Sequence, residues 1–250
     1  MIEPIVRLHD LSKNFAGVHA VQHVSLEIAP GERRAVLGPN GAGKTTLFNL
    51  IAGTETPSTG SVELFGRDAT HLPAWRRTKL GMARTFQTSR VLSGLSVEDN
   101  LYLAALGPEG GHLRPLRNRR DGILRERARR TAERVALTSR LAALARDLSH
   151  GEQRQLEIGL AIAAEPRLML LDEPAAGLSR SERQLLTQLL IALDKAVTLI
   201  IIEHDMEVAL TVAERVTIMH YGTVVTEGTP AEIRADQRVH DIYLGRTDAA

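Results

Sequence analysis

Eight consecutive residues in the first fifth of the chain limit its fold more than any other stretch. They are Gly38, Pro39, Asn40, Gly41, Ala42, Gly43, Lys44 and Thr45, followed directly by Thr46. Their spacing matches G-x-x-x-x-G-K-[ST], in which glycines let backbone N–H groups turn toward a polyphosphate. Residues 33–37 read as a short buried strand before the loop, and residues 46–52 as a helix after it. The sequence therefore predicts a strand, a phosphate-binding loop and a helix in this order.

Two side chains at the end of this loop suit a nucleotide and its metal ion. Lys44 would reach the β- and γ-phosphates, and the Thr45 hydroxyl would bind Mg²⁺. The N-terminus of the following helix would add partial positive charge. A chance glycine-rich turn is the alternative, and the full pattern in a strand–loop–helix setting favours nucleotide binding.

Length and composition narrow the class of protein. The 250 residues are 43% hydrophobic, which suffices for one domain, 1–250, with a large core. The net charge of +1 gives no general reason to expect nucleic acid, and the lack of cysteine excludes disulfides and thiol catalysis. No signal peptide is visible, and the longest apolar runs are shorter than the ~18 residues of a membrane span. We expect a soluble chain whose membrane role, if any, comes through a partner.

The expected elements indicate an α/β fold with a mostly parallel sheet. The chain up to residue 66 is rich in strands, whereas the middle, about 88–150, is read as an inserted helical subdomain. After Gly151, strands and helices alternate, as they do in parallel sheets covered on both faces. Strands are expected at 5–8, 21–28, 33–37, 61–65, 168–171, 197–202 and 216–219, with a hairpin-like stretch at 221–228. Further helices are expected at 73–80, 97–105, 123–136, 152–164, 180–193 and 206–213.

Two acids follow the expected strand 168–171. Asp172 stands where a phosphate-loop fold presents a carboxylate to Mg²⁺. Glu173 stands next to it, where a second acid can orient or deprotonate the attacking water. The alternative is a pair of solvated acids at a strand end, which the upstream loop disfavours.

Residues 148–153 read Leu-Ser-His-Gly-Glu-Gln, which resembles the signature motif of ABC-type ATPases. The spacing from this motif to Asp172 also resembles that family, and the resemblance extends from Val6 to about Gly245. It implies a P-loop NTPase core with an N-terminal antiparallel β subdomain and the inserted helical subdomain. It also implies ATP hydrolysis at a dimer interface. In that arrangement Ser149, Gly151 and Glu152 act on the ATP that the partner subunit holds.

The resemblance assigns three more residues. Phe15 stands where the family places an aromatic ring against adenine, and Gln87 where a glutamine contacts Mg²⁺ and the attacking water. His204 matches the histidine that contacts the γ-phosphate. The alternatives are a core phenylalanine, an ordinary loop glutamine and a satisfied histidine at a strand end.

Some features depart from the family or lie outside its motifs. His150 occupies a position where the signature usually has glycine, and Ser179 one where many members have aspartate. The segment 114–134 holds nine arginines and three acids. We interpret it as a solvated helix with paired charges, and a contact with anionic lipid headgroups is the alternative.

A finer resemblance is to the ATP-binding subunits of branched-chain amino acid importers. It rests on residues 83–87, 107–120, 155–158, 172–178, 228–233 and 243–245. It implies a permease, a second ATPase subunit, identical or paralogous, and indirectly an external solute-binding protein, with no nucleic acid. The chain would be cytoplasmic and peripheral on the inner face of the membrane. Subunits for urea, short amides or lipopolysaccharide share parts of this set, and an ABC ATPase not coupled to transport is a further alternative.

Overall fold

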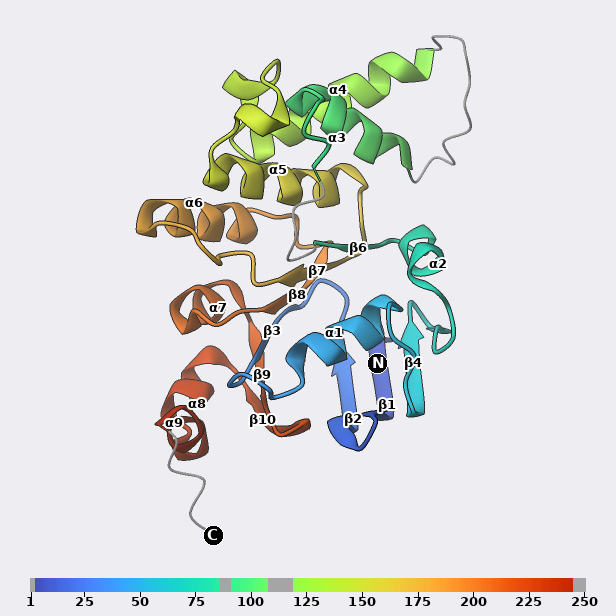
Figure 1. The fold of residues 1–250 in the computed structure, drawn as a ribbon, viewed down its shortest axis with the longest axis vertical. Coiled ribbons are helices and arrows are strands. Elements are labelled where there is room, and N and C mark those ends of the chain that lie inside the picture. Colours follow the sequence, from blue (N-terminus) through green and yellow to red (C-terminus); the bar gives the residue numbers. More distant parts are fainter. Residues whose placement is uncertain (1–2, 86–90, 108–118, 245–250) are drawn as a thin grey trace.

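The structure is a computed structural model that describes residues 3–85, 91–107 and 119–244 (Figure 1). Its chain forms two sheets. The larger is six-stranded, in the order β10-β9-β3-β8-β7-β6. Five of its strands are parallel, and β10 runs antiparallel to β9. The mostly parallel sheet is therefore confirmed. Its strands are β3 (Arg33–Leu37), β6 (Met82–Arg84), β7 (Leu168–Asp172), β8 (Thr198–Ile202), β9 (Arg215–His220) and β10 (Thr223–Gly228).

The smaller sheet is the expected N-terminal antiparallel one, in the order β2-β1-β4-β5. Its strands are β1 (Val6–Phe15), β2 (Val18–Ile28), β4 (Thr59–Leu64) and β5 (Arg67–Asp68). The prediction of a first strand over 5–8 was too short. Polar residues such as Lys13 and Asn14 continue β1 on the more exposed part of the sheet, where an antiparallel strand can face water.

Helices cover both faces of the larger sheet. On one side α1 (Lys44–Ala52) packs in a core shared with the smaller sheet. On the other side lie α5 (His150–Ala163), α6 (Arg180–Ile191) and α7 (Met206–Val212). Figure 1 shows α3 (Val97–Leu106) and α4 (Arg119–Arg134) stacked beyond α5, at the end of the molecule away from the smaller sheet. The remaining helices are α2 (Ala74–Lys79), α8 (Pro230–Ala235) and α9 (Gln237–Leu244), with short turns of 3-10 helix at Thr138–Arg140 and Ala145–Asp147.

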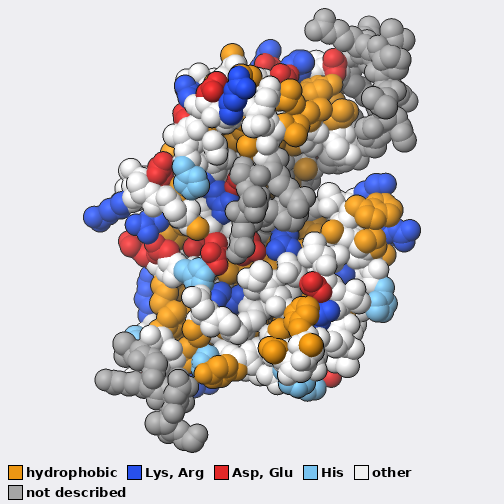
Figure 2. Space-filling view, in the orientation of Figure 1, with side chains coloured by type: hydrophobic (Ala, Val, Ile, Leu, Met, Phe, Trp, Pro, Cys, Tyr) orange, Lys and Arg blue, Asp and Glu red, His pale blue; other side chains and the backbone are white. Residues whose placement is uncertain are grey.

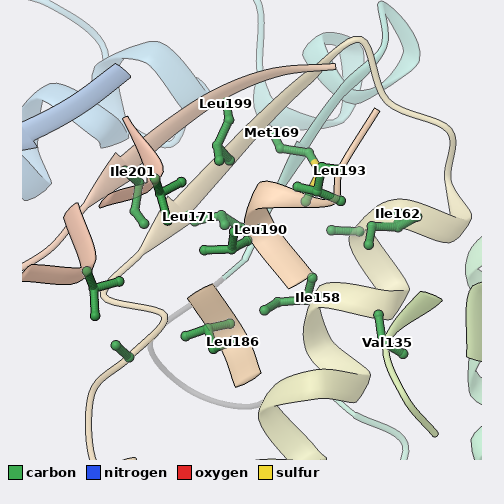
Figure 3. Packing of buried hydrophobic residues seen from close by; sticks show 14 of the residues in the cluster. Val135, Ile158, Ile162, Met169, Leu171, Leu186, Leu190, Leu193, Leu199 and Ile201 are labelled. Atoms are coloured by element: carbon green, nitrogen blue, oxygen red, sulfur yellow. The ribbon is translucent and has the colours of Figure 1, made fainter. Parts of the chain in front are cut away.

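The core on the α5 and α6 side fixes the ends of the central strands. Leu171 of β7 and Ile201 of β8 point toward Leu190 of α6, and Ile158 reaches the same cluster from α5 (Figure 3). Each of these side chains is at most 1% exposed. Burying one stabilises the fold by about 1.5–3 kcal/mol. The packing therefore holds α5 against the strand that ends at Asp172.

The sequence did not predict β5, β6, α8 or α9. Of these, β5 and β6 have only two and three residues, which is too short for a clear period. The helix expected over 123–136 is α4, which begins at Arg119 and ends at Arg134. Among the helices of the described ranges, none combines the length and the apolar character that crossing a bilayer requires.

Candidate functional site

The glycine-rich loop joins β3 to α1, and its path is too tight for side chains at two positions. Gly43 has φ +95° directly before α1, and a Cβ there would lie 2.2 Å from the Ala20 carbonyl oxygen. A Cβ on Gly38 would lie 2.1 Å from the carbonyl oxygen of Met219. The loop is thus wedged between β2 and β9, so these glycines are required by sterics as well as by backbone freedom.

Lys44 is the first residue of α1 and is only 5% exposed. Its Nζ donates hydrogen bonds to the carbonyl oxygens of Gly38 (2.7 Å) and Pro39 (2.9 Å). Burial lowers the pKa of Lys44, while the charges of Glu173 and Asp172 oppose that shift. The ammonium group is therefore held over the loop beside two acids, where it can bind a phosphate.

One cleft of about 570 Å³ collects most of the predicted residues. The loop residues Asn40 to Thr46 line it together with Glu173 and His204, which come from the ends of β7 and β8. Its volume is in the range of small-molecule sites. Figure 2 shows charged and histidine side chains gathered across the middle of the face it presents, below the helical layer. The remaining lining residues are Val18, His19, Ala20, Gln22 and Tyr221.

Asp172 ends β7 and is 1% exposed. Its Oδ2 accepts from Arg84 Nη2 at 3.3 Å, and its Oδ1 has no hydrogen-bond partner in the part of the chain that the structure describes. Burial raises the pKa of Asp172, and Arg84 opposes the shift. A buried oxygen that lacks a partner fits a metal ligand, since Mg²⁺ is usually held by one or two carboxylates together with phosphates and water.

Glu173 follows in the left-handed conformation, with φ +49°. Its Oε1 lies 2.5 Å from Nε2 of His204, and its backbone N–H donates to the carbonyl oxygen of Ile202. The Glu173 side chain is 23% exposed, so it remains accessible to water in the cleft. An acid and an imidazole in contact at the cleft wall can orient a water molecule and bind a terminal phosphate.

The signature residues lie elsewhere. Ser149 is the N-cap of α5, and neither it, Gly151 nor Glu152 lines the cleft of its own chain. The Glu152 carboxylate accepts from the Ser149 N–H at 2.8 Å and pairs with Arg140 at 3.0 Å, so it is engaged within this chain. A Cβ on Gly151 would lie 2.2 Å from Glu182 Oε1, which shows close contact between α5 and α6.

Of the two departures from the family pattern, Ser179 has a local structural role. Ser179 is the N-cap of α6, and its hydroxyl and Glu182 form a reciprocal capping box. His150 lies against Gly177, where an added Cβ would be 3.1 Å from His150 Nε2.

Of the predicted residues, Gly38, Pro39, Asp172 and Phe15 are not among those that line the cleft. Phe15 is 42% exposed at the end of β1, with Lys13 Nζ 4.8 Å from its ring centroid, and it is not among the lining residues. Gln87 lies outside the described residues. Sequence reasoning missed Tyr221, which is 65% exposed in the turn between β9 and β10. Its carbonyl oxygen accepts from Gln22 Nε2 at 2.8 Å, a contact that the sequence gives no means to foresee.

The arginines of α4 pair with neighbouring elements. Arg129 binds Glu98 at 3.0 Å, and Arg127 binds Glu165 at 3.1 Å. Arg125 lies 3.5 Å from Asp99. These pairs agree with the interpretation of a helix with compensated charges, although the expected partners were within α4 itself. Residues 114–118 of the basic segment lie outside the described residues.

P-loop ATPases hold a nucleoside triphosphate with a phosphate loop and acids at a strand end. In this chain the loop and Glu173 line one cleft at the edge of a mostly parallel sheet, so the fold places the chain in that class. The model of the family described as "ABC transporter" matches residues 21–176, so the chain belongs to that family. A second model, "Branched-chain amino acid ATP-binding cassette transporter", matches residues 223–249.

Curated relatives match over nearly the full length. The chain is 36% identical over 253 residues to LivG of Salmonella typhimurium, a high-affinity branched-chain amino acid transport ATP-binding protein, covering 98% of this chain and 99% of that one. It is 34% identical over 257 residues to BraF of Pseudomonas aeruginosa, which carries the same description, with the same coverage.

Solved structures agree with the fold. The ADP conformation of MJ1267, an ATP-binding cassette of an ABC transporter, has a TM-score of 0.86 at 27% identity, covering 97% of this chain and 99% of that chain. The dimeric post-hydrolysis state of the cassette MJ0796, bound to ADP and Pi, has a TM-score of 0.78 at 26% identity, covering 90% and 98%.

Proposed function

We propose that this chain is the ATP-binding and hydrolysing motor subunit of an importer for branched-chain amino acids. The solute is inferred from the near full-length similarity to LivG and BraF, both named for transport of these amino acids. The match of residues 223–249 to a branched-chain amino acid family model supports it independently of the phosphate loop.

The predicted residues have distinct roles in hydrolysis. Lys44 binds the β- and γ-phosphates, and Glu173 orients or deprotonates the attacking water. His204, in contact with Glu173, binds the γ-phosphate. Thr45 and Asp172, together with Gln87, would hold Mg²⁺. This ion would neutralise charge on the phosphates.

The working unit is a dimer of ATPase subunits. Ser149 and Gly151 lie away from the cleft of their own chain, which supports a role at the ATP of a partner subunit. A similar cassette forms a dimer with ADP and Pi bound. Closure of the two subunits would change the conformation of a permease.

Transport across a membrane requires two further partners. A permease crosses the membrane, and an external solute-binding protein delivers the amino acid to it. The chain would then be cytoplasmic and peripheral on the inner face of the membrane. We treat 1–250 as one domain that includes a helical subdomain at about 88–150.

Uptake measurements test the solute. Deleting the gene should abolish most uptake of radiolabelled leucine, isoleucine and valine, and the gene supplied in trans should restore it. Urea and short amides serve as comparators. Loss of urea uptake with normal branched-chain uptake would assign the motor to the related importer class instead.

A further inference from the structure

Arg154, on the first half of α5, holds the backbone that carries the two strand-end acids. Its Nε donates to the Pro174 carbonyl oxygen at 2.8 Å. Its Nη2 donates to the carbonyl oxygens of Asp172 (3.2 Å) and Glu173 (2.5 Å). One guanidinium group thus binds three consecutive carbonyl groups, and the Arg154 side chain is only 10% exposed.

The remaining nitrogen of the guanidinium group has a charged partner. Arg154 Nη1 lies 2.6 Å from Glu157 Oε2, one turn further along α5, and the Glu157 side chain is also 10% exposed. A buried cation with an acid beside it and carbonyls on its other nitrogens has a hydrogen-bond partner at every nitrogen. The planar fork of arginine suits this arrangement, whereas a lysine ammonium cannot span three acceptors in the same way.

The Asp172–Pro174 backbone requires hydrogen-bond donors from outside the segment. Glu173 has φ +49°, which is strained for a residue with a side chain. Pro174 has no N–H to donate, and the next donor, the Ala175 N–H, binds the buried carboxylate of Glu203 at 2.7 Å. Arg154 therefore supplies the donors to the carbonyl side of the turn that aims Glu173 into the cleft.

We propose that Arg154 is a positioning residue for ATP hydrolysis. It holds the Asp172–Pro174 backbone so that the Glu173 carboxylate stays beside His204 at the attacking water. The inference rests on the proposed role of Glu173. Arg154 does not line the cleft that holds the loop, Glu173 and His204, and it acts through the backbone of Glu173.

The position of Arg154 also connects two ATP sites. Ser149, the N-cap of α5, would serve the partner's nucleotide, and Arg154 lies one turn further along the same helix. Any shift of α5 when the subunits close therefore moves the group that holds Glu173 of the same chain.

The proposal is tested by measuring ATP turnover and ATP binding separately. Arg154→Gln, combined with Glu157→Gln so that no buried acid is left unpaired, should lower kcat roughly 10- to 100-fold, because small misplacements of catalytic groups have effects of this size. The dissociation constant for ATP should stay within about twofold, since Lys44 and the loop are untouched. Arg154→Lys should give an intermediate kcat.

A buried arginine elsewhere supplies the matched control. Arg77 is 1% exposed and donates to the carbonyl oxygens of Leu50, Ile51 and Leu72, far along the chain from Glu173. Arg77→Gln should lower Tm and leave kcat of the folded protein near the wild-type value. An Arg154 variant that is folded by melting and keeps wild-type kcat would overturn the proposal. If the wild-type chain itself hydrolyses no ATP, the proposed function fails, and the role of Arg154 fails with it.

Mixed dimers show whether the loss of Arg154 impairs the ATP site of its own chain or that of the partner. When an Arg154→Gln chain pairs with a Lys44→Ala chain, the only site with an intact loop uses Glu173 of the first chain and Ser149 of the second. Hydrolysis should stay low, because Arg154 positions Glu173 of its own chain. Recovery to the level of a Ser149→Arg and Lys44→Ala mixture would instead assign the effect to the signature residues and overturn the proposal.

Discussion

Asp172 and Glu173 are neighbours in sequence but differ in burial. Asp172 is enclosed at the end of β7, where burial raises its pKa and one oxygen lacks a partner among the described residues. Glu173 turns out of the sheet with φ +49° and reaches the cleft, in contact with His204. The first is thereby suited to a metal ion and the second to a water molecule.

Glu173→Gln tests the second role. The amide keeps the size of the side chain and loses its ability to take a proton, so ATP should still bind while turnover stops. The arrested protein should accumulate as a dimer with ATP between its subunits, measured by size-exclusion chromatography with ATP and Mg²⁺. A monomer that hydrolyses ATP at the wild-type rate would contradict this role.

Two aromatic side chains, Tyr221 and Phe15, are candidates for stacking on the nucleotide base, and binding measurements distinguish them. Tyr221 lines the cleft and Phe15 does not, although Phe15 matches the family position. If the base stacks on an aromatic ring, the alanine variant of that residue should weaken ATP binding by about 1–3 kcal/mol. Lys44→Ala should weaken it more, because it removes charge-assisted bonds to phosphate. Nucleotide titrations of the three variants give the order, and similar ATP and GTP affinities are expected from stacking alone.

At the scale of elements, helix ends determine where the functional residues lie. α5 and α6 both begin with a serine N-cap and a glutamate three residues later, which satisfy each other's backbone donors. The packing of Gly151 against Glu182 brings these two ends together. The signature residues are thus fixed by capping as much as by the core.

Glu152 tests this capping role. Glu152→Ala removes the acceptor for the Ser149 N–H and should destabilise the fold by about 1 kcal/mol, which lowers Tm by roughly 2–4 °C in a chain of this size. Glu152→Gln retains a capping oxygen and should melt close to the wild type. Thermal unfolding of both variants is the measurement, and equal Tm for all three proteins would contradict the role.

The loops after β7 and β8 share a buried acid whose pKa gives a pH prediction. Burial raises the pKa of Glu203, although the N–H groups of Ala175, His204 and Asp205 oppose the shift. The folded state therefore binds this proton more tightly than the unfolded chain. Stability should fall as pH rises from the unfolded pKa to the raised folded pKa, and stay level above it.

Glu203→Gln should remove this fall. The difference in unfolding free energy between variant and wild type should shift in favour of the variant as pH rises through that window. Urea titrations at several pH values measure it. A constant difference across the window would contradict the raised pKa.

At the scale of the whole molecule, the residues of the proposed site do not all lie in the cleft of one chain. The cleft holds the loop, Glu173 and His204, whereas Ser149 and Gly151 lie at the N-terminus of α5, outside it. The complete site would therefore need a second subunit.

Mixing two inactive variants tests the shared site. Ser149→Arg damages the surface offered to a partner, and Lys44→Ala damages the chain's own loop. In a mixed dimer one site carries both lesions and the other carries neither, so hydrolysis should recover to a level that neither variant shows alone. A mixture that pairs and stays inactive would contradict a shared site with independent halves.

The sequence by itself determined the class of fold and the candidate residues of the site. A phosphate loop, an apolar strand ending in acids and the alternation after Gly151 are local patterns, and local patterns are set by backbone freedom and side-chain period. They correctly predicted the mostly parallel sheet, and the family resemblance added the separate antiparallel sheet and His204, which lies in one cleft with Lys44 and Glu173.

Only the tertiary structure decided which residues meet across the chain. Tyr221 enters the cleft because the β9–β10 turn is bound to Gln22 of β2, nearly two hundred positions earlier. Arg154 reaches the Asp172–Pro174 carbonyls because α5 packs on the sheet, and no spacing in the sequence encodes that contact. The physical reason is that such contacts depend on how close-packed elements are oriented, which a periodic pattern leaves open.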